Sequence, residues 1–269
     1  MPRNVSLRPG RALAELTLIV LAVLIALAVD SWRQKQEERG IEREYLTRLA
    51  ADLEVNKKLF FGYRQFHEDV LANAKAIYPI VKGTITEVGD TTDVIVHAYQ
   101  ATRHVIPDYV DDTFEELKSA GNLRLIENQQ IRMGLLAYYR ILESEDYPFE
   151  LASKDYREFI RRMIDPELQQ RIRAECELQP PHLGIGGSFE VSVAAHSGGC
   201  PVDFGEFDYA ALFRQIANND ELRGALALTI MQWTRGISEV LDPALEHTEE
   251  LRLLVVQELG QTVDTLGQG

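Results

Sequence analysis

The sequence predicts an all-α protein in which one N-terminal transmembrane helix continues into a bundle of long helices. Three observations carry this prediction. Residues 12–29 are almost entirely apolar, residues 32–81 space their apolar side chains at helical intervals, and Asp, Asn and Thr stand where further helices would begin. One segment, residues 179–203, breaks the pattern with prolines and glycines. We expect it to form a long loop that holds at most one small β-hairpin.

The predicted anchor reads ALAELTLIVLAVLIALAV and is interrupted only by Glu15. A helix of this length spans about 27 Å, close to the hydrocarbon thickness of a bilayer. Trp32 follows where an interfacial aromatic residue is expected. We therefore divide the chain into a short cytoplasmic segment, 1–11, a transmembrane helix, 12–32, a helical extracytoplasmic domain, 33–266, and a flexible tail, 267–269.

Two other interpretations of the apolar run are weaker. A cleaved signal peptide is suggested by Ala26-Leu27-Ala28, but Glu15 disturbs the basic region that such a peptide needs. A buried core helix would keep a polar stripe, whereas Thr17 is the only polar residue from Leu16 to Val29. Glu15 lies about one turn inside the span. We interpret it as a carboxylate at headgroup depth, the alternatives being contact with a partner helix or a proton site.

The distribution of charge along the chain limits where the protein can lie and what it can bind. Three of the 28 basic residues and one of the 42 acidic residues precede Asp30, so the rest of the chain carries a net charge of about −16. Such a domain repels phosphate backbones, so no nucleic-acid partner is expected. Arg3, Arg8 and Arg11 favour a cytoplasmic N-terminus, although as many basic residues follow the span. We expect a single-pass inner-membrane protein whose domain faces the periplasm.

Beyond the span, the helical spacing from Trp32 to Val81 predicts one long helix that ends at Pro79 and Lys82-Gly83. We expect it to form one side of an antiparallel bundle rather than a coiled coil. The other expected helices are 94–103 after Thr91-Thr92-Asp93, 114–117 capped by Thr113, 129–142 capped by Asn128, a helical stretch through 159–178, 209–217 capped by Asp208, and a long C-terminal helix after Asn218 or Asn219 that is kinked or restarted at Pro243.

Three parts of the sequence resemble a known family. The string ELTLIVLAVLIAL at 15–27 with Trp32, the pair Asp52 and Asn56, and TFEELKSAGNLRLI at 113–126 are similar to an uncharacterised bacterial family of single-span, mostly helical membrane-anchored proteins. The resemblance covers much of the chain and consists of hydrophobic and turn patterns. It implies a tethered helical domain and carries over no activity. The proline- and glycine-rich loop between Cys176 and Cys200 departs from the family pattern.

A cluster of aromatic residues predicts an interface on the long helix. Four aromatic side chains fall on adjacent rows within about one and a half turns: Phe60, Phe61, Tyr63 and Phe66. The long helix has more apolar surface than one bundle seam requires, so we expect some of these side chains to be exposed and to anchor a partner. The alternative is that all four belong to the core.

The two cysteines, Cys176 and Cys200, bracket the loop. In an oxidising compartment such a pair predicts a disulfide. His182 and His196 lie in the same loop, so a four-ligand zinc site is an alternative, although its spacing matches no common finger. Two free thiols are the third possibility.

Other candidate chemistry is weaker. An acidic stretch beside His104 lacks the spacing of a calcium-binding loop. We interpret its carboxylates as solvent-exposed and helix-capping: Asp108, Asp111, Asp112, Glu115 and Glu116. No serine has a nucleophile context. We expect no cofactor and no enzymatic activity.

The leading hypothesis for the function is a non-catalytic accessory, scaffold or assembly subunit of a larger membrane protein complex, for example a respiratory or photosynthetic one. It would contact the bilayer and an integral membrane partner and could self-associate. The alternative is an extracytoplasmic ligand-sensing or binding module.

Overall fold

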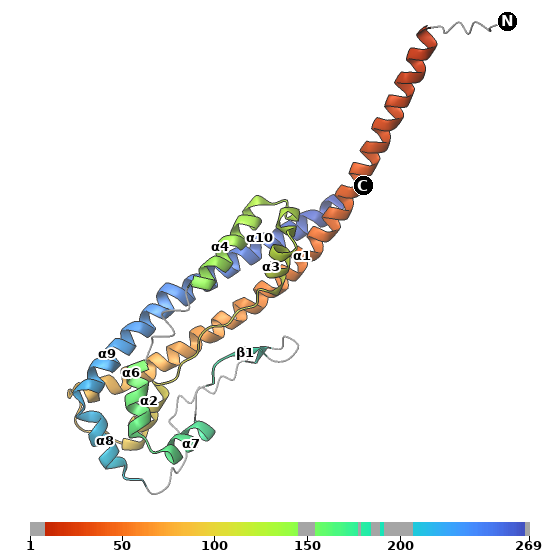
Figure 1. Ribbon diagram of the computed structural model, residues 1–269. Coiled ribbons are helices and arrows are strands. Elements are labelled where there is room, and N and C mark those ends of the chain that lie inside the picture. Colours follow the sequence, from red (N-terminus) through yellow and green to blue (C-terminus); the bar gives the residue numbers. More distant parts are fainter. Residues whose placement is uncertain (1–8, 145–153, 177–178, 184–188, 191–206, 267–269) are drawn as a thin grey trace, which may run out of the picture.

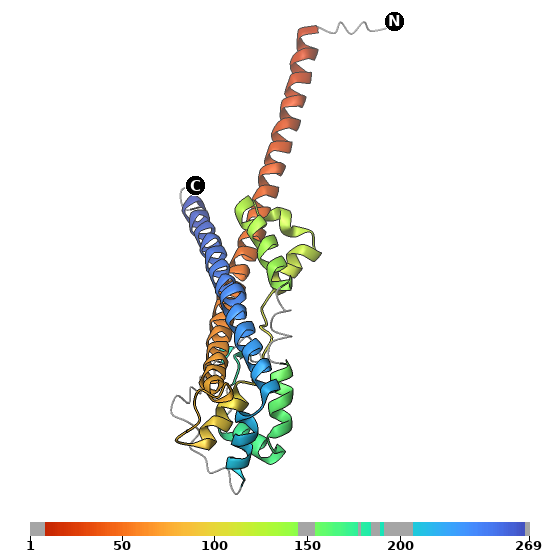
Figure 2. The ribbon, with the colours of Figure 1, turned by 90° about the vertical axis from the view of Figure 1, so that its left-hand side faces the viewer.

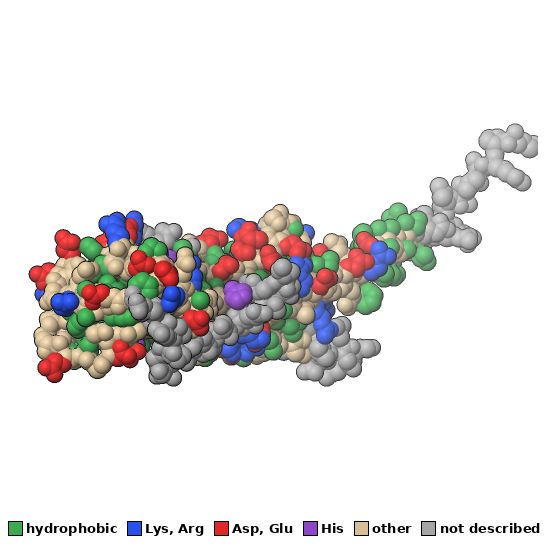
Figure 3. All heavy atoms as spheres, turned by 90° about the horizontal axis from the view of Figure 1, so that it is seen from below, with side chains coloured by type: hydrophobic (Ala, Val, Ile, Leu, Met, Phe, Trp, Pro, Cys, Tyr) green, Lys and Arg blue, Asp and Glu red, His purple; other side chains and the backbone are tan. Residues whose placement is uncertain are grey.

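The computed structural model describes residues 9–144, 154–176, 179–183, 189–190 and 207–266. Its described part is built of helices around one long helix, α1 (Pro9–Val81), as the sequence predicts (Figure 1). Residues 16–29 of α1 are exposed throughout, and the body begins beyond them. Figure 3 shows apolar side chains gathered around this projecting segment, while acidic and basic side chains are mixed over the body.

Among the described residues, one helix is long and apolar enough to cross a membrane. The segment that qualifies lies near the N-terminus, has a mean hydropathy of 2.0, and buries none of its apolar window against the rest of the chain. A core helix of a soluble domain would bury that window. The structure therefore keeps the apolar run as a candidate span and excludes its use as a core helix of this chain.

The far end of α1 closes as the sequence predicts. Pro79 lies in the last turn, and Gly83 adopts a left-handed conformation with a φ of 78°. The Gly83 amide donates to the carbonyl of Ile80 at 2.9 Å, and the Thr84 amide donates to that of Pro79 at 2.9 Å. These bonds satisfy carbonyls that the end of a helix leaves open, and a left-handed residue at this position favours glycine.

The chain returns along α1 through α9 (Asp220–Arg235), a π-helix η2 (Gly236–Leu241) and α10 (Asp242–Leu266). The C-terminal end of α10 thus lies at the end of the body nearest the candidate span (Figures 1 and 2). Ion pairs join the two sides of this hairpin, with Lys57 to Glu249 at 3.0 Å and Arg64 to Asp242 at 2.6 Å. The antiparallel pairing predicted for the long helix is therefore present.

The π-helix has a cause in the sequence. Pro243 has no N–H, and in a regular α-helix its ring would clash with the carbonyl four residues earlier. One wide turn lies just before Pro243, where the Asp242 amide donates to the carbonyl of Ile237, five residues back. The sequence predicted an interruption at Pro243, and the chain accommodates the proline by widening the helix without ending it.

The proximal half of the body, nearest the candidate span, adds α3 (Asp112–Ser119), a short 3₁₀ helix η1 (Asn122–Leu125) and α4 (Gln129–Ser144) to α1 and α10. Their apolar side chains form one core cluster, which runs along α1 from Tyr45 to Leu71. Thr113 was expected to cap α3. It lies inside the helix instead, because α3 begins at Asp112 after Asp111.

The distal half is built from α2 (Thr91–Gln100), α6 (Lys154–Met163), α7 (Pro166–Glu175) and α8 (Tyr209–Ala217), packed on the end of α1 and on α9. They share a second core cluster, which begins at Ala74 of α1. Asp90 caps α2, so this helix starts before the expected Val94, while Asp208 and Asn219 cap α8 and α9 as predicted. Asp165 caps α7 by accepting from the Glu167 amide at 2.8 Å.

Two strands of two residues each, β1 (His182–Leu183) and β2 (Phe189–Glu190), pair antiparallel in the region of the predicted loop. Most of residues 179–203 lie outside the described residues. The loop and its small hairpin therefore stay predictions.

Candidate functional site

The motif residues of α1 and of the 113–126 stretch meet in the proximal half. Asn56 is fully buried, and its side-chain amide donates to the Val110 carbonyl at 2.8 Å and accepts from the Val110 amide at 2.6 Å. Asp52, one turn earlier, accepts from the Thr113 amide at 3.3 Å. Because that amide lies in the first turn of α3, the carboxylate partly replaces a cap for the helix. The segment before α3 is thus fixed to α1 by side chains.

A second group of polar contacts holds the middle of α3. The Tyr45 hydroxyl donates to Glu116 at 3.1 Å and accepts from the Asn122 side chain at 3.1 Å, while Arg48 forms an ion pair with Glu116. The bonds from Arg48 and Tyr45 lower the pKa of the Glu116 carboxyl below its ordinary value. Glu116 therefore holds α3 on α1, and no side chain caps the helix at its N-cap residue, Asp111.

The connection from η1 to α4 is fixed in the same way. The Glu42 carboxylate, which is almost fully buried, accepts from the Glu127 amide at 2.6 Å, and burial raises the pKa of Glu42. Asn128 caps α4, as predicted, by accepting from the amide of Gln130 at 2.9 Å, and its side chain donates to Glu258 of α10 at 2.6 Å. The start of α4 is therefore held by both α1 and α10.

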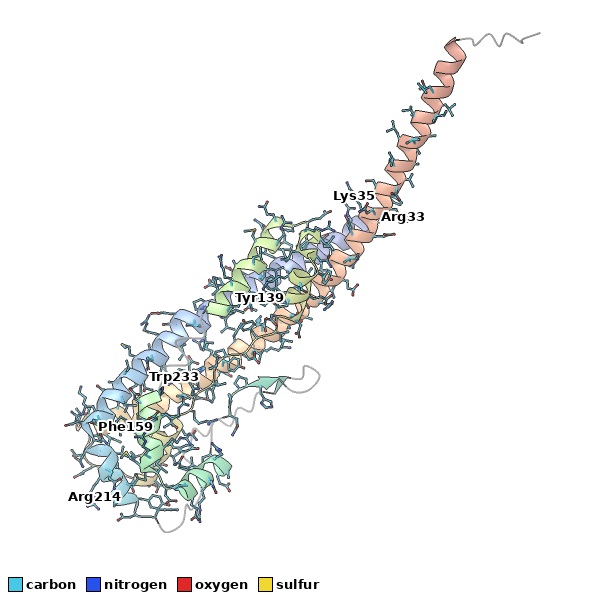
Figure 4. The ribbon with its side chains drawn as sticks, viewed as in Figure 1. Arg33, Lys35, Tyr139, Phe159, Arg214 and Trp233 are labelled. Atoms are coloured by element: carbon cyan, nitrogen blue, oxygen red, sulfur yellow. The ribbon has the colours of Figure 1, made fainter. Side chains whose placement is uncertain are left out.

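One side of α4 packs tightly against α10. At Gly134 a Cβ atom would meet the Leu251 side chain at 3.0 Å, so the glycine permits a close approach of the two helices. The Tyr138 hydroxyl lies 2.9 Å from that of Thr248 on α10. Tyr139, labelled in Figure 4, stacks on Phe114 of α3 with ring centroids 4.3 Å apart. This side of α4 belongs to the core.

The other side of α4 borders an open groove against α3 with a volume of about 390 Å³. Met133 and Leu136 are 55% and 39% exposed there and lie three residues apart on α4, so the two side chains are neighbours on the helix surface. Charged side chains complete the edge. The groove is lined by Phe114, Lys118, Met133, Leu136, Ala137, Arg140 and Glu143.

No family model, no curated protein and no solved structure matches this chain. The resemblance to a single-span bacterial family therefore stays a prediction. What the groove can bind must be argued from its own chemistry.

The predicted aromatic interface on α1 is wrong for three of its four residues. Phe60, Tyr63 and Phe66 are buried in the proximal core cluster. Only Phe61 of the four is exposed, at 53%. Several helices pack around this part of α1. They cover apolar side chains on more than one side of the helix, including those that a single helix–helix contact could not have buried. A cluster of exposed aromatics is therefore absent from the described surface of α1.

The residues assigned to the membrane boundary lie on α1. Trp32 is exposed, and Arg33 and Lys35, labelled in Figure 4, follow it just beyond the apolar segment. Glu15 lies in α1, and its side chain is outside what the structure describes. Its placement at headgroup depth stays a prediction.

Cys176 ends α7 with its side chain buried and is disulfide-bonded, and the Gln100 side chain donates to its backbone carbonyl. Cys200 and His196 lie outside the described residues, so the pairing of the two cysteines stays a prediction. Within the described ranges, no three His, Cys, Asp or Glu side chains are grouped so that they could hold a metal ion.

The acidic stretch near His104 is used locally. Asp108 accepts from the Tyr109 amide at 2.9 Å, and Glu115 pairs with Lys118 at 2.8 Å. Burial and neighbouring carboxylates raise the pKa of Asp111.

Sequence reasoning missed the α3–α4 groove, although the sequence contained a signal for it. The buried stripe of α4 contains Ile131, Leu135, Tyr138 and Leu142, and Met133 and Leu136 fall outside it.

Proposed function

We propose that this protein is a membrane-anchored accessory or assembly subunit whose α3–α4 groove binds a helix of a larger membrane protein complex. The observation that carries the proposal is the groove itself. It exposes Met133 and Leu136 on a helix whose other side is fixed by Gly134, Tyr138 and Tyr139. A rigid, partly apolar groove with charged edges suits an amphipathic helix, which would lay its apolar face on these side chains.

The anchor limits where such a partner can lie. Glu42, the first buried residue of the body, lies thirteen positions along α1 after Val29, the end of the apolar run. A helix rises 1.5 Å per residue, so the body begins about 20 Å beyond the membrane boundary. Lipid cannot reach the groove at that height. The partner must therefore extend a folded or helical part out of the bilayer.

The orientation belongs to the same proposal. Three arginines precede the span, and a disulfide at Cys176 suits an oxidising compartment, so the body would face the periplasm and the N-terminus the cytoplasm. A C-terminal alkaline phosphatase fusion should then be active, and a C-terminal green fluorescent protein fusion should be dark. The reverse pair of results would contradict this orientation.

The docking role is tested with two matched double variants of the full chain, purified in mild detergent. The groove variant carries Met133→Glu and Leu136→Glu. The control variant carries Leu253→Glu and Val256→Glu on the exposed side of α10, where the native side chains are 52% and 45% exposed. Since all four substitutions lie on the surface, both variants should keep the unfolding temperature of the parent to within a few degrees.

Quantitative mass spectrometry then measures which integral membrane protein copurifies. Interface anchors often contribute more than about 2 kcal/mol each, so the groove variant should retain at least about tenfold less of that partner. The control variant should retain it in full. Equal retention by both variants, or equal loss from both, would contradict docking at the groove.

A further inference from the structure

The distal half of the body has a hollow that is larger than the α3–α4 groove. Two adjoining openings, of about 570 and 540 Å³, share Phe159, Arg162 and Glu221 in their lining. They form one trough, with α6 on one side and α9 and the end of α8 on the other. We name it the α6–α9 trough. Figure 4 shows Phe159 and Arg214, which both line it, at the end of the body farthest from the candidate span.

The floor of the trough is apolar. Phe159 and Met163 of α6 and Ala225 of α9 are partly buried and pack on the distal core cluster. Leu228 lies three residues beyond Ala225 and is 44% exposed, and Met231, three residues further along, is 52% exposed. This apolar surface therefore extends along α9 for about two turns. An amphipathic helix buries its apolar face against a surface of this kind.

The walls of the trough carry two carboxylates that form no ion pair among the described residues. Asp155 stands on α6 and Glu221 on α9, so one lies on each wall. Outside the described residues, the only lysine or arginine residues of the chain are Arg3 and Arg8, which precede the candidate span. No other part of the chain can therefore supply a lysine or arginine to neutralise the two carboxylates.

Most of the other charges along the trough are compensated. Glu158 pairs with Arg162 at 3.0 Å, and Asp220 pairs with Arg223 at 2.5 Å. Arg214 lines only the opening of about 570 Å³. The uncompensated charges that line the other opening, where the apolar floor is most exposed, are therefore all negative among the described residues.

We propose that the α6–α9 trough is a second docking surface, which binds an amphipathic helix of another protein with lysine or arginine on both sides of its apolar face. The apolar face would lie on Leu228 and Met231. The basic side chains on its two flanks would meet Asp155 on one wall and Glu221 on the other. This surface lies in the other half of the body from the α3–α4 groove, so the two proposals hold or fail separately.

Two other occupants do not fit the trough. Arg223 of α9 donates to the Val81 carbonyl at 3.1 Å, and Val81 lies about 78 Å beyond Val29 along α1 at 1.5 Å per residue. Lipid of the anchoring bilayer therefore cannot reach the trough. A second copy anchored in the same membrane would hold its own trough at the same height. The carboxylates of Asp155 and Glu221 would then face their counterparts, and like charges brought together oppose association.

The test uses the full chain in a mild non-ionic detergent and two synthetic helical peptides as probes. Both peptides carry leucines along one side. The first has lysines on both flanks of that side, and the second has glutamates in the same places. Each carries a photoreactive group, so that illumination attaches the bound peptide to the protein and mass spectrometry locates the attachment. The yield against peptide concentration gives the Kd.

Two matched double variants accompany the parent. The trough variant carries Leu228→Gln and Met231→Gln, and the control variant carries Leu253→Gln and Val256→Gln on the exposed side of α10. The lysine peptide should attach to α6 and α9 of the parent, and the trough variant should bind it at least about tenfold more weakly. The control variant should bind it like the parent. The glutamate peptide should bind the parent at least about tenfold more weakly than the lysine peptide does.

Both variants should keep the Tm of the parent to within a few degrees, because all four side chains are exposed. The proposal is overturned if the two peptides bind equally, if both variants lose binding equally, or if the lysine peptide attaches mainly elsewhere. It is also overturned if the trough variant alone lowers the Tm by several degrees, since the chain itself would then cover these side chains. If the parent is a dimer and the trough variant is a monomer, the trough binds a second copy and the proposed occupant is wrong.

Discussion

Asn56→Ala should loosen the attachment of residues 105–126 to α1. The alanine removes both bonds between the Asn56 amide and the backbone of Val110, at 2.8 and 2.6 Å. The Val110 carbonyl keeps the Tyr139 hydroxyl as a donor at 3.3 Å, whereas the Val110 amide loses the acceptor that it has in the structure. An unsatisfied buried group costs about 1–3 kcal/mol. With the lost bond to the carbonyl, we expect the free energy of unfolding to fall by about 2–4 kcal/mol.

Thermal unfolding in detergent measures the global effect. One kcal/mol corresponds to about 2–4 °C for a chain of this size, so the Tm should fall by about 4–16 °C. Hydrogen–deuterium exchange locates the change, because peptides from residues 105–126 should exchange faster than those of α9. Lys58→Ala, an exposed change two residues further along α1, is the control and should leave both measurements unchanged. The reasoning fails if Asn56→Ala shifts the Tm by less than about 1 °C, or if exchange rises equally in every helix.

Three further outcomes follow from the core and from two titrating groups. His67→Phe should flatten the pH dependence of Tm between about pH 3 and 6.5. Burial lowers the pKa of His67 to about 3, so in this pH range the unfolded chain binds a proton that the folded chain does not. The parent therefore loses up to about 5 kcal/mol of stability as the pH falls through this range. Glu249→Gln should reduce the fall in Tm below about pH 4.5. Hydrogen bonds from Arg252 and Lys57 lower the pKa of Glu249 to about 2, so the stabilisation from these bonds is lost as the pH falls toward that value. Measuring Tm against pH checks this. Phe66→Ala should lower the Tm by several degrees in a thermal scan and Phe61→Ala should not, because Phe66 is buried and Phe61 is exposed; equal effects would contradict the assignment of Phe66 to the core.

The helices could be predicted from the sequence because their signals are local. The spacing of apolar residues in 32–81, the Gly83 end and the caps at Asn128 and Asp208 each involve neighbours within a few residues. The same periodicity shows which side of a helix is apolar but not what covers it. Phe60 and Phe66 were assigned to an interface for that reason, and the core of the body buries them.

The candidate sites depend on contacts between residues far apart in the chain. Asn56 and Val110, and Phe159 and Leu228, are each more than fifty residues apart. No local pattern specifies such pairs. The partial exception is α4, where Met133 and Leu136 lie off the apolar stripe and could have been singled out as surface residues from the sequence.

Site-specific photocrosslinking in native membranes tests the docking role most directly. A photoreactive amino acid replaces Leu136 in the α3–α4 groove, and in a second strain it replaces Leu253 on the exposed side of α10. Illumination of the first strain should yield one dominant adduct with an integral membrane protein. The second strain should not yield this adduct. If Leu136 gives no adduct, or if both positions give the same adducts in the same yield, the groove is not the docking surface of this protein.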